Sequence, residues 1–223
     1  MAHSYFHAKS SAVHFGGVLE DYLPIHSWFD STKQAYADLR HRAVLHNDVA
    51  IDIAKQIFGE HIVNADGEVV SVVAIGQQHM LEDLGCIPSL EDWLDRLPLN
   101  EEWMQRGWQE SDFEAQTMRQ AEVSAKRFGG GAADYLPIHE FLDQTVHWYP
   151  DVRHRAILHS SFGIFVAERK FGVTIRNSIG REVPTRVIAE GHVILELGHI
   201  PTMEAWLKDL PLKEWMVRNA LPL

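Results

Sequence analysis

The feature that most constrains the fold of this chain is an internal duplication. DYLPIH at 21–26 returns 113 residues later at 134–139. LGCIPSLEDWLDRLPL at 84–99 corresponds in the same register to LGHIPTMEAWLKDLPL at 197–212. Two copies of roughly a hundred residues are too few for a solenoid. The sequence therefore predicts two similar repeats packed as a pseudo-two-fold pair, the covalent equivalent of a homodimer.

The repeat boundaries follow from where the internal match begins and ends. We expect repeat one at 1–104, a connector at 105–116 and repeat two at 117–223. Both repeats end in a tail rich in aromatic and apolar residues, LPL followed by EWM, which is a candidate for the interface between them. The four tryptophans near the repeat ends are expected to pack in the core or between the repeats: Trp93, Trp103, Trp206 and Trp215.

Each repeat is predicted to be mainly helical. Asp38 and Asp151 stand where N-caps would open long helices that end near the FG pairs. The short segments around Gly67 and Gly180 combine apolar and turn residues, a pattern typical of a β-hairpin. A further helix is expected to stop at Gly85. The predicted fold class is mostly α with a small β-hairpin per repeat.

Charge and composition narrow the classes of function. The net charge is −11, which argues against nucleic acid as the main partner, although a local basic pocket for a small anionic molecule remains open. No apolar run reaches the roughly 18 residues of a membrane span, and the N-terminus lacks the apolar core of a secretory signal. With one cysteine, no disulfide framework is expected, so the predicted location is the cytoplasm.

Histidines are the most unusual component, with 14 in 223 residues. Four of them recur at equivalent positions of the two repeats although neighbouring residues differ. The recurring pairs are His26 and His139, His41 and His154, His46 and His159, and His79 and His192.

The motif RHRAVLH places two of these histidines on different faces of an expected helix. Arg42 and His46 lie on a line that continues into apolar residues, whereas His41 lies on a polar stripe expected near solvent. A buried arginine needs an anionic partner, for which Asp30, and Asp143 beside the copy of this motif, are the first candidates.

Spacing of histidines and carboxylates suggests a metal site. A histidine and a carboxylate four residues apart on a helix can bind one divalent ion, and three such imidazoles leave a coordination position open for water. Zinc, manganese or iron would suit these ligands. The predicted ligands are His26, His46, His79 and Asp30 in repeat one, and His139, His159, His192 and Asp143 in repeat two.

Two functions are consistent with these residues. The first is a metal-dependent hydrolase of a small phosphorylated or carboxylated molecule, in which Asp83 or Glu196 acts as the base and Arg42 or Arg155 holds the anion. The second is a non-catalytic binding or assembly protein whose histidine networks are structural. Such a protein could associate with further copies of itself. Both stay open at the level of sequence.

The motifs DYLPIH, RHRA-x-LH and H-x-x-x-[DE]-LG-x-IP resemble a family of domains of about a hundred residues from bacteria and phages. The resemblance covers nearly the whole chain in two copies and implies no reaction. It does imply further histidines beside His46 and near His7. Here position 47 is Asn, its copy at 160 is Ser, and the counterpart of His7 is Gln120. If those histidines are ligands, repeat two has lost more of them than repeat one.

Overall fold

The chain folds into two compact helical units in a computed structural model that describes residues 4–108 and 113–217. Unit 1 comprises residues 1–96 and 208–223, and unit 2 comprises residues 97–207. Each unit therefore contains the body of one repeat and the C-terminal tail of the other.

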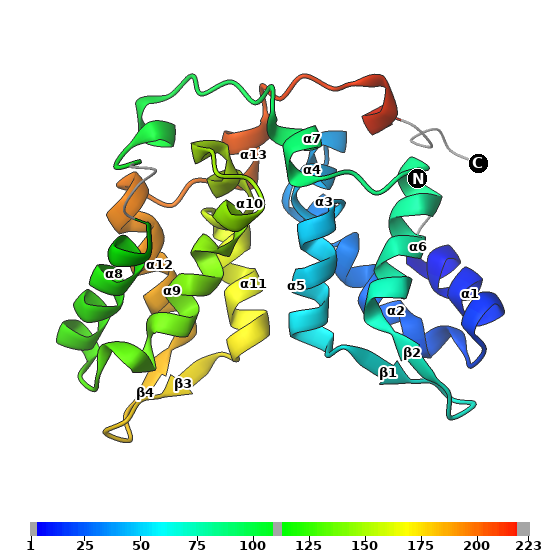
Figure 1. The fold of residues 1–223 in the computed structure, drawn as a ribbon, viewed down its shortest axis with the longest axis horizontal. Helices are drawn as coiled ribbons and strands as arrows, with labels where there is room; N and C mark the ends of the chain where they lie inside the picture. Colours follow the sequence, from blue (N-terminus) through cyan, green and yellow to red (C-terminus); the bar gives the residue numbers. More distant parts are fainter. Residues whose placement is uncertain (1–3, 109–112, 218–223) are drawn as a thin grey trace. The chain divides into compact units, whose positions relative to one another are not determined.

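Unit 1 is a cluster of short helices with one hairpin at its end (Figure 1). Helices α1, α2, α5 and α6 pack on one another and provide most of its core. Its elements are α1 (Ser4–Phe15), α2 (Leu19–Phe29), α3 (Thr32–Ala35), η1 (Leu39–His41), α4 (Arg42–Leu45), α5 (Asp48–Phe58), β1 (His61–Val63), β2 (Val69–Ser71), α6 (Val72–Leu84), α7 (Leu90–Leu94) and, from the tail of repeat two, η6 (Glu214–Val217).

Unit 2 repeats this arrangement. None of the helices in the described ranges is long and apolar enough to cross a membrane. The elements of unit 2 are η2 (Glu102–Gln105) from the tail of repeat one, α8 (Phe113–Phe128), η3 (Ala132–Asp134), α9 (Leu136–Asp143), η4 (Gln144–His147), η5 (Val152–His154), α10 (Arg155–Leu158), α11 (Ser161–Phe171), β3 (Thr174–Arg176), β4 (Glu182–Pro184), α12 (Thr185–Leu197) and α13 (Met203–Leu207).

The predicted fold class is confirmed. Both hairpins are antiparallel, with Ile62 opposite Val70 in the first and Ile175 opposite Val183 in the second. Gly67 adopts a positive φ of 82° in the turn of the first hairpin, a conformation that favours glycine. The predicted pseudo-two-fold packing of the repeats stays a prediction.

The long helix expected after Asp38 is wrong. The segment forms the 3₁₀ helix η1 and the single turn α4, and then breaks at His46, whose φ and ψ are −117° and 59°. Asp38 caps only η1, by accepting a hydrogen bond from the backbone of Arg40 at 2.9 Å. Helix α5 has its own cap, because the Asn47 side chain accepts from the Ala50 N–H at 2.9 Å. This break decides where the side chain of His46 points.

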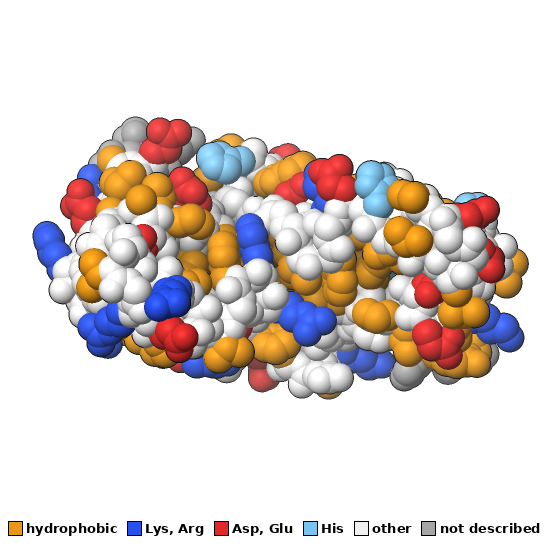
Figure 2. All heavy atoms as spheres, turned by 90° about the horizontal axis from the view of Figure 1, so that it is seen from below, with side chains coloured by type: hydrophobic (Ala, Val, Ile, Leu, Met, Phe, Trp, Pro, Cys, Tyr) orange, Lys and Arg blue, Asp and Glu red, His pale blue; other side chains and the backbone are white. Residues whose placement is uncertain are grey.

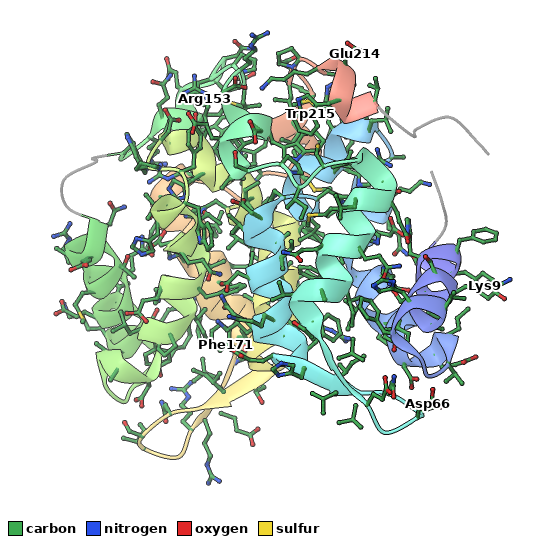
Figure 3. The ribbon with its side chains drawn as sticks, turned by 45° about the vertical axis from the view of Figure 1, so that its right-hand side comes forward. Lys9, Asp66, Arg153, Phe171, Glu214 and Trp215 are labelled. Atoms are coloured by element: carbon green, nitrogen blue, oxygen red, sulfur yellow. The ribbon has the colours of Figure 1, made fainter. Side chains whose placement is uncertain are left out.

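The exchanged tails are fixed by tryptophan pairs. In unit 1 the ring of Trp215, labelled in Figure 3, lies 4.8 Å from the ring of Trp93. In unit 2 Trp103 lies 4.7 Å from Trp206. Trp93 and Trp206 are fully buried, as expected for core residues.

The first arginine of each RHRA motif binds a tail backbone. Arg40 donates from Nε to the carbonyl of Leu210 at 2.7 Å, and Arg153 donates to the carbonyl of Leu97 at the same distance. The two repeats thus hold each other's tails through equivalent hydrogen bonds.

The surface of each unit carries both charges. Figure 2 shows basic and acidic side chains mixed on the part of each unit that faces the viewer. The eight recurring histidines are all buried inside their units.

Candidate metal centres

Each unit brings two imidazoles and two carboxylates together in its interior. The four side chains of each group offer ligand atoms that all lie within 4.8 Å of one another. The groups are Asp30, His46, His79 and Asp83 in unit 1, and Asp143, His159, His192 and Glu196 in unit 2. All four positions recur at the offset of the duplication, so both repeats build the same constellation.

Three segments of unit 1 supply these side chains. Asp30 caps the C-terminus of α2, and His46 lies in the break between α4 and α5. His79 and Asp83 are four residues apart on one face of α6. Trp93 of α7 donates a hydrogen bond from Nε1 to the backbone carbonyl of His46 at 2.8 Å, which holds the break in place.

The ligand atoms of unit 1 surround one point. His46 Nε2 lies 3.1 Å from His79 Nε2 and 3.2 Å from Asp83 Oδ2. Asp30 Oδ1 completes the group at 4.0 Å from His79 Nε2. Asp30 is also the most exposed member, with 14% of its side chain accessible, so the centre comes nearest to solvent at this residue.

The group in unit 2 is tighter. His159 Nε2 lies 3.0 Å from both His192 Nε2 and Glu196 Oε2. Asp143 Oδ1 lies 3.3 Å from His159 Nε2 and 3.2 Å from His192 Nε2. The longer side chain of Glu196 thus occupies the place that Asp83 holds in unit 1.

All of these separations except the 4.0 Å between Asp30 and His79 fit neighbouring ligands of one ion. Ligand atoms that neighbour one another around an ion with bonds of about 2.1 Å lie about 3.0–3.4 Å apart. Three of the carboxylate oxygens are buried and accept no hydrogen bond from the described residues: Asp30 Oδ1, Asp143 Oδ1 and Glu196 Oε2, of which the last has Arg155 as an ion-pair partner. Buried oxygens of this kind carry a large desolvation cost, which a cation would offset.

His26 and His139, which are expected as ligands, lie outside the groups, and each contacts a grouped histidine. The Nδ1 atom of His26 lies 3.0 Å from Nδ1 of His79, and His139 has the same distance to His192. The three imidazoles of each repeat lie close together, but only two of them face the proposed ion position, so the predicted set of three imidazole ligands around one ion is wrong. Such second contacts commonly orient a metal-binding histidine.

A chain of hydrogen bonds sets the tautomer of His79. Gln78 donates to the carboxylate of Glu82, so its oxygen accepts from the Ser11 hydroxyl at 2.7 Å. Ser11 Oγ in turn accepts from His26 Nε2 at 2.8 Å, and His26 Nδ1 must then accept from His79 Nδ1. His79 Nε2 is left with a lone pair directed at the centre, as a metal ligand requires.

The inner arginines are fully buried, as expected, but pair with different carboxylates from those expected. Arg42 Nη2 lies 3.0 Å from Asp83 Oδ2, and Arg155 Nη2 lies 3.0 Å from Glu196 Oε2. The side chains suggested as base and anion holder are therefore ion-paired with each other. The expected partners, Asp30 and Asp143, instead accept hydrogen bonds from Ser4 and Thr117.

The expectation that His41 and His154 lie near solvent is wrong. His41 is 1% exposed, and its Nδ1 lies 2.8 Å from the hydroxyl of Thr32. His154 is equally buried, with its Nδ1 2.8 Å from Thr145. The polar stripe assumes one continuous helix, but these histidines lie in η1 and η5, and the break that follows separates them from the rest of the stripe.

Three contacts beside the centre of unit 1 were not predicted from residue spacing, although the family resemblance implied a histidine near His7. His7 is 1% exposed, with Nδ1 2.6 Å from Glu82 and Nε2 3.3 Å from Asp83. Ser4 donates to Asp30 at 2.6 Å. Ser4 and its copy, Thr117, both carry a hydroxyl at the same offset, a signal that was present in the sequence.

Unit 2 replaces the histidine contact by amides. Gln120, the counterpart of His7, donates to Glu196 Oε1 at 2.8 Å, and Gln116 donates to the same oxygen at 3.0 Å. Because a histidine and a glutamine occupy the equivalent position, comparison of the two repeats did not identify it, and only the family resemblance pointed to it.

Burial and charge act against each other in both centres. Burial disfavours ionised Asp83, but His46, His7 and Arg42 hold its pKa well below the usual range. Burial also disfavours charged His7, yet its contacts with Asp83 and Glu82 raise its pKa to about 9. Asp83 is thus ionised and available as a ligand.

In unit 2 the same opposition between burial and charge affects the imidazole of His159. Burial opposes a charge on His159, but Glu196 and Asp143 outweigh it and raise the pKa of His159. Without an ion, a proton on His159 offsets part of the negative charge of the two carboxylates. Burial lowers the pKa of His139 to about 3, so this second-contact histidine is neutral.

Comparison with known families matches both repeats. A family described as a domain of unknown function, DUF6915, matches residues 2–104 and again residues 115–216. No curated protein and no solved structure matches the chain. The two matches confirm the tandem duplication and the resemblance drawn from the RHRA and DYLPIH motifs. The chain therefore belongs to the DUF6915 family and carries its domain twice.

Proposed function

We propose that the protein is a metalloprotein that binds one divalent ion in each unit. The observation that carries this proposal is the pair of equivalent four-residue groups, each with ligand atoms within 4.8 Å of one another. The ligands would be Asp30, His46, His79 and Asp83 in one centre, and Asp143, His159, His192 and Glu196 in the other.

The charges of each group support a cation. Three carboxylates meet two cations around the site of unit 1, which leaves an excess of negative charge. The carboxylates are Asp30, Glu82 and Asp83, and the cations are Arg42 and His7. A divalent ion would offset that charge and use the lone pair of His79 Nε2. Two imidazoles with two carboxylates suit zinc, manganese or iron better than calcium, which prefers oxygen ligands alone.

The reaction we propose is hydrolysis of a small phosphorylated or carboxylated molecule. A bound ion supplies a water of lowered pKa and polarises the anionic group of the substrate. The water oxygen would bond to the phosphorus or carbonyl carbon, the ester bond would break, and the water proton would pass to the leaving oxygen. Arg42 would keep Asp83 ionised and Arg155 would keep Glu196 ionised, so these arginines position ligands.

Deep burial favours a second candidate, a non-catalytic binding or assembly protein. Apart from Asp30, the grouped side chains are at most 4% exposed. In this case the ions, or the histidine hydrogen bonds alone, would hold α2, α6 and the α4–α5 break together.

Elemental analysis of the full chain purified without a histidine tag tests metal binding. We expect one ion per unit, and half that content in His79→Gln and in His192→Gln. His61→Gln is the control, because His61 is exposed on the hairpin strand β1. A folded protein that remains metal-free after incubation with zinc, manganese and iron(II) would overturn the proposal.

Hydrolysis is tested separately on metal-loaded protein with aryl phosphate and carboxyl esters. Turnover by the wild-type protein that is lost in the double variant, His79→Gln with His192→Gln, supports the hydrolase. Full metal content without turnover on any of these esters supports the non-catalytic alternative.

A further inference from the structure

Helix α1, which carries the label of Lys9 in Figure 3, brings a further imidazole to the centre of unit 1. The His7 side chain is 1% exposed, and its Nε2 forms no hydrogen bond with the described residues, although it lies 3.3 Å from Asp83 Oδ1. Neighbouring ligand atoms of one ion are about 3.0–3.4 Å apart. The other oxygen of Asp83, Oδ2, faces His46 and Arg42. The Asp83 carboxylate can therefore bridge two ions, one on each oxygen.

A second carboxylate holds His7 in the orientation of a metal ligand. His7 Nδ1 lies 2.6 Å from Glu82 Oε2, and Glu82 Oε1 accepts from Ser10 at 2.6 Å and from Gln78 at 2.8 Å. A carboxylate that accepts a hydrogen bond from one ring nitrogen directs the other nitrogen at the metal in many sites. An ion at Nε2 would take the place of the proton that charged His7 carries without it.

This position is separate from that of the first ion. His7 is not one of the four side chains of unit 1 whose ligand atoms all lie within 4.8 Å of one another. An ion with bonds of about 2.1 Å cannot join ligand atoms that are more than about 4.2 Å apart. Paired ions, about 3.5–4 Å apart, are common in enzymes that hydrolyse phosphate esters. His7 and Asp83 thus provide a place for the second member of such a pair.

Unit 2 lacks the residues for a second ion. Gln120 and Leu195 replace the histidine and the glutamate that form the position in unit 1. Gln120 donates to Glu196 Oε1 at 2.8 Å, and Gln116 donates to the same oxygen at 3.0 Å. Two N–H donors therefore occupy the oxygen that would have to bind the ion, and an amide N–H group has no lone pair to offer a metal.

The charge of the site decides what must accompany the second ion. Once His7 is neutral, two divalent ions and Arg42 carry five positive charges. Three carboxylates carry three negative charges: Asp30, Glu82 and Asp83. The remaining two positive charges would be costly in the protein interior. A dianion between the ions offsets them, and the phosphate group of a monoester has about this charge near neutral pH.

We propose that unit 1 binds a second divalent ion between His7 Nε2 and Asp83 Oδ1, together with the phosphate group of a small monoester. Ions such as magnesium are commonly held by one or two protein side chains, water and a substrate phosphate, which suits a position with two protein ligands. This inference rests on the proposed metal centres and narrows their substrate class to phosphate monoesters. It also assigns the paired ions to unit 1 alone.

Titration of the full chain with manganese(II), with and without inorganic phosphate, tests the proposal. Equilibrium dialysis counts the bound ions, and electron paramagnetic resonance shows whether two of them are magnetically coupled. We expect two ions per chain without phosphate and three with it. The third ion should produce the spectrum of a coupled pair, because a single carboxylate bridges it to its neighbour.

Variants that exchange residues between the repeats locate the third ion. His7→Gln should remove it together with the coupled spectrum, and Glu82→Gln should weaken its binding about tenfold or more. His14→Gln is the control on an exposed face of α1 and should keep three ions. The double variant Gln120→His with Leu195→Glu should add a fourth ion in unit 2, which tests the position even if His7→Gln does not fold.

The outcomes separate the two proposals. Two bound ions at saturating phosphate would overturn the second position and leave the metal centres standing. A third ion that is uncoupled, or that persists in folded His7→Gln, would be an adventitious ion only and would overturn it equally. A protein that binds no ion under any of these conditions would reject the metal centres, and the second position with them.

Discussion

Among individual residues, Arg42 is the one on which the candidate centre of unit 1 most depends. It is fully buried, and its ion pair with Asp83 is one of the contacts that keep this carboxylate ionised in the protein interior. We expect Arg42→Met to lower the free energy of unfolding by about 3–5 kcal/mol, because it leaves the Asp83 charge buried without this partner. Urea denaturation of the metal-free protein measures the change.

Arg96→Met is the matched control, since the Arg96 side chain is 70% exposed and should contribute less than about 1 kcal/mol. Equal stability of the two variants would show that the interior pair is worth no more than a surface one.

The lowered pKa of buried His41 leads us to expect that the protein loses stability in acid. Burial, with the nearby His46 and Arg42, lowers the pKa of His41 to about 3, whereas an unfolded histidine titrates near 6.5. Between these values the unfolded chain binds more protons, so stability is full above about pH 6.5 and falls as the pH drops towards 3.

Removing the His41 imidazole should make the free energy of unfolding less dependent on pH in acid. We expect His41→Asn to reduce the slope of unfolding free energy against pH by up to about 1.4 kcal/mol per pH unit between pH 6 and 4. Urea titrations of metal-free protein at several pH values measure the slope. The exposed His61→Asn should leave it unchanged, and an unaltered slope in His41→Asn would refute the neutral, buried state of His41.

Among the elements, the break between α4 and α5 determines the centre. Asn47 accepts from the N–H of Ala50 at 2.9 Å and donates to the carbonyl of Ala43 at 2.8 Å, so it joins both helices at the turn that presents His46. We expect Asn47→Ala to cost about 1–2 kcal/mol of stability and, by releasing His46, to weaken metal binding by about tenfold or more.

The cap of α7 provides the comparison for that variant. Ser89 accepts from the N–H of Asp92 at 3.0 Å and touches no member of the centre, so Ser89→Ala should lose similar stability at unchanged metal affinity. Chelator competition on both variants measures the affinity. Equal affinity in Asn47→Ala and wild type would separate the break from metal binding.

How much of this could be predicted varies with the range of the interaction. The hairpins and the helix ends at Gly85 and Gly198 were predictable because local turn chemistry decides them. The break at His46 was not, since the apolar spacing continues through it and only Asn47 signalled a new cap. Histidine recurrence singled out His46 and His79, which the structure places in one group, but a helical face could not distinguish a grouped imidazole from that of His26, which contacts His79 from outside the group.

At the scale of the whole molecule, the exchanged tails could not be predicted from the sequence. The two tails are so similar in sequence that either would fit either body, and only the path of the chain decides between them. The structure pairs Trp215 of repeat two with Trp93 of repeat one, and Trp103 of repeat one with Trp206 of repeat two.

Hydrogen exchange of a tail variant tests this exchange. We expect Trp215→Ala to cost about 2–4 kcal/mol and to speed amide exchange in α7, which belongs to repeat one. Trp103→Ala should instead speed exchange in α13, which belongs to repeat two. Faster exchange confined to the repeat that carries each substitution would contradict the tail exchange.

The exchange of tails also bears on how such a gene can evolve. A stop codon in the connector would remove Trp215 together with repeat two, and the remaining body would lose the ring that covers Trp93. Neither half can then be deleted without damaging the other, although each half could diverge freely in its side chains. The exchanged tails therefore favour the retention of both copies in one gene, while the side chains of each copy remain able to specialise.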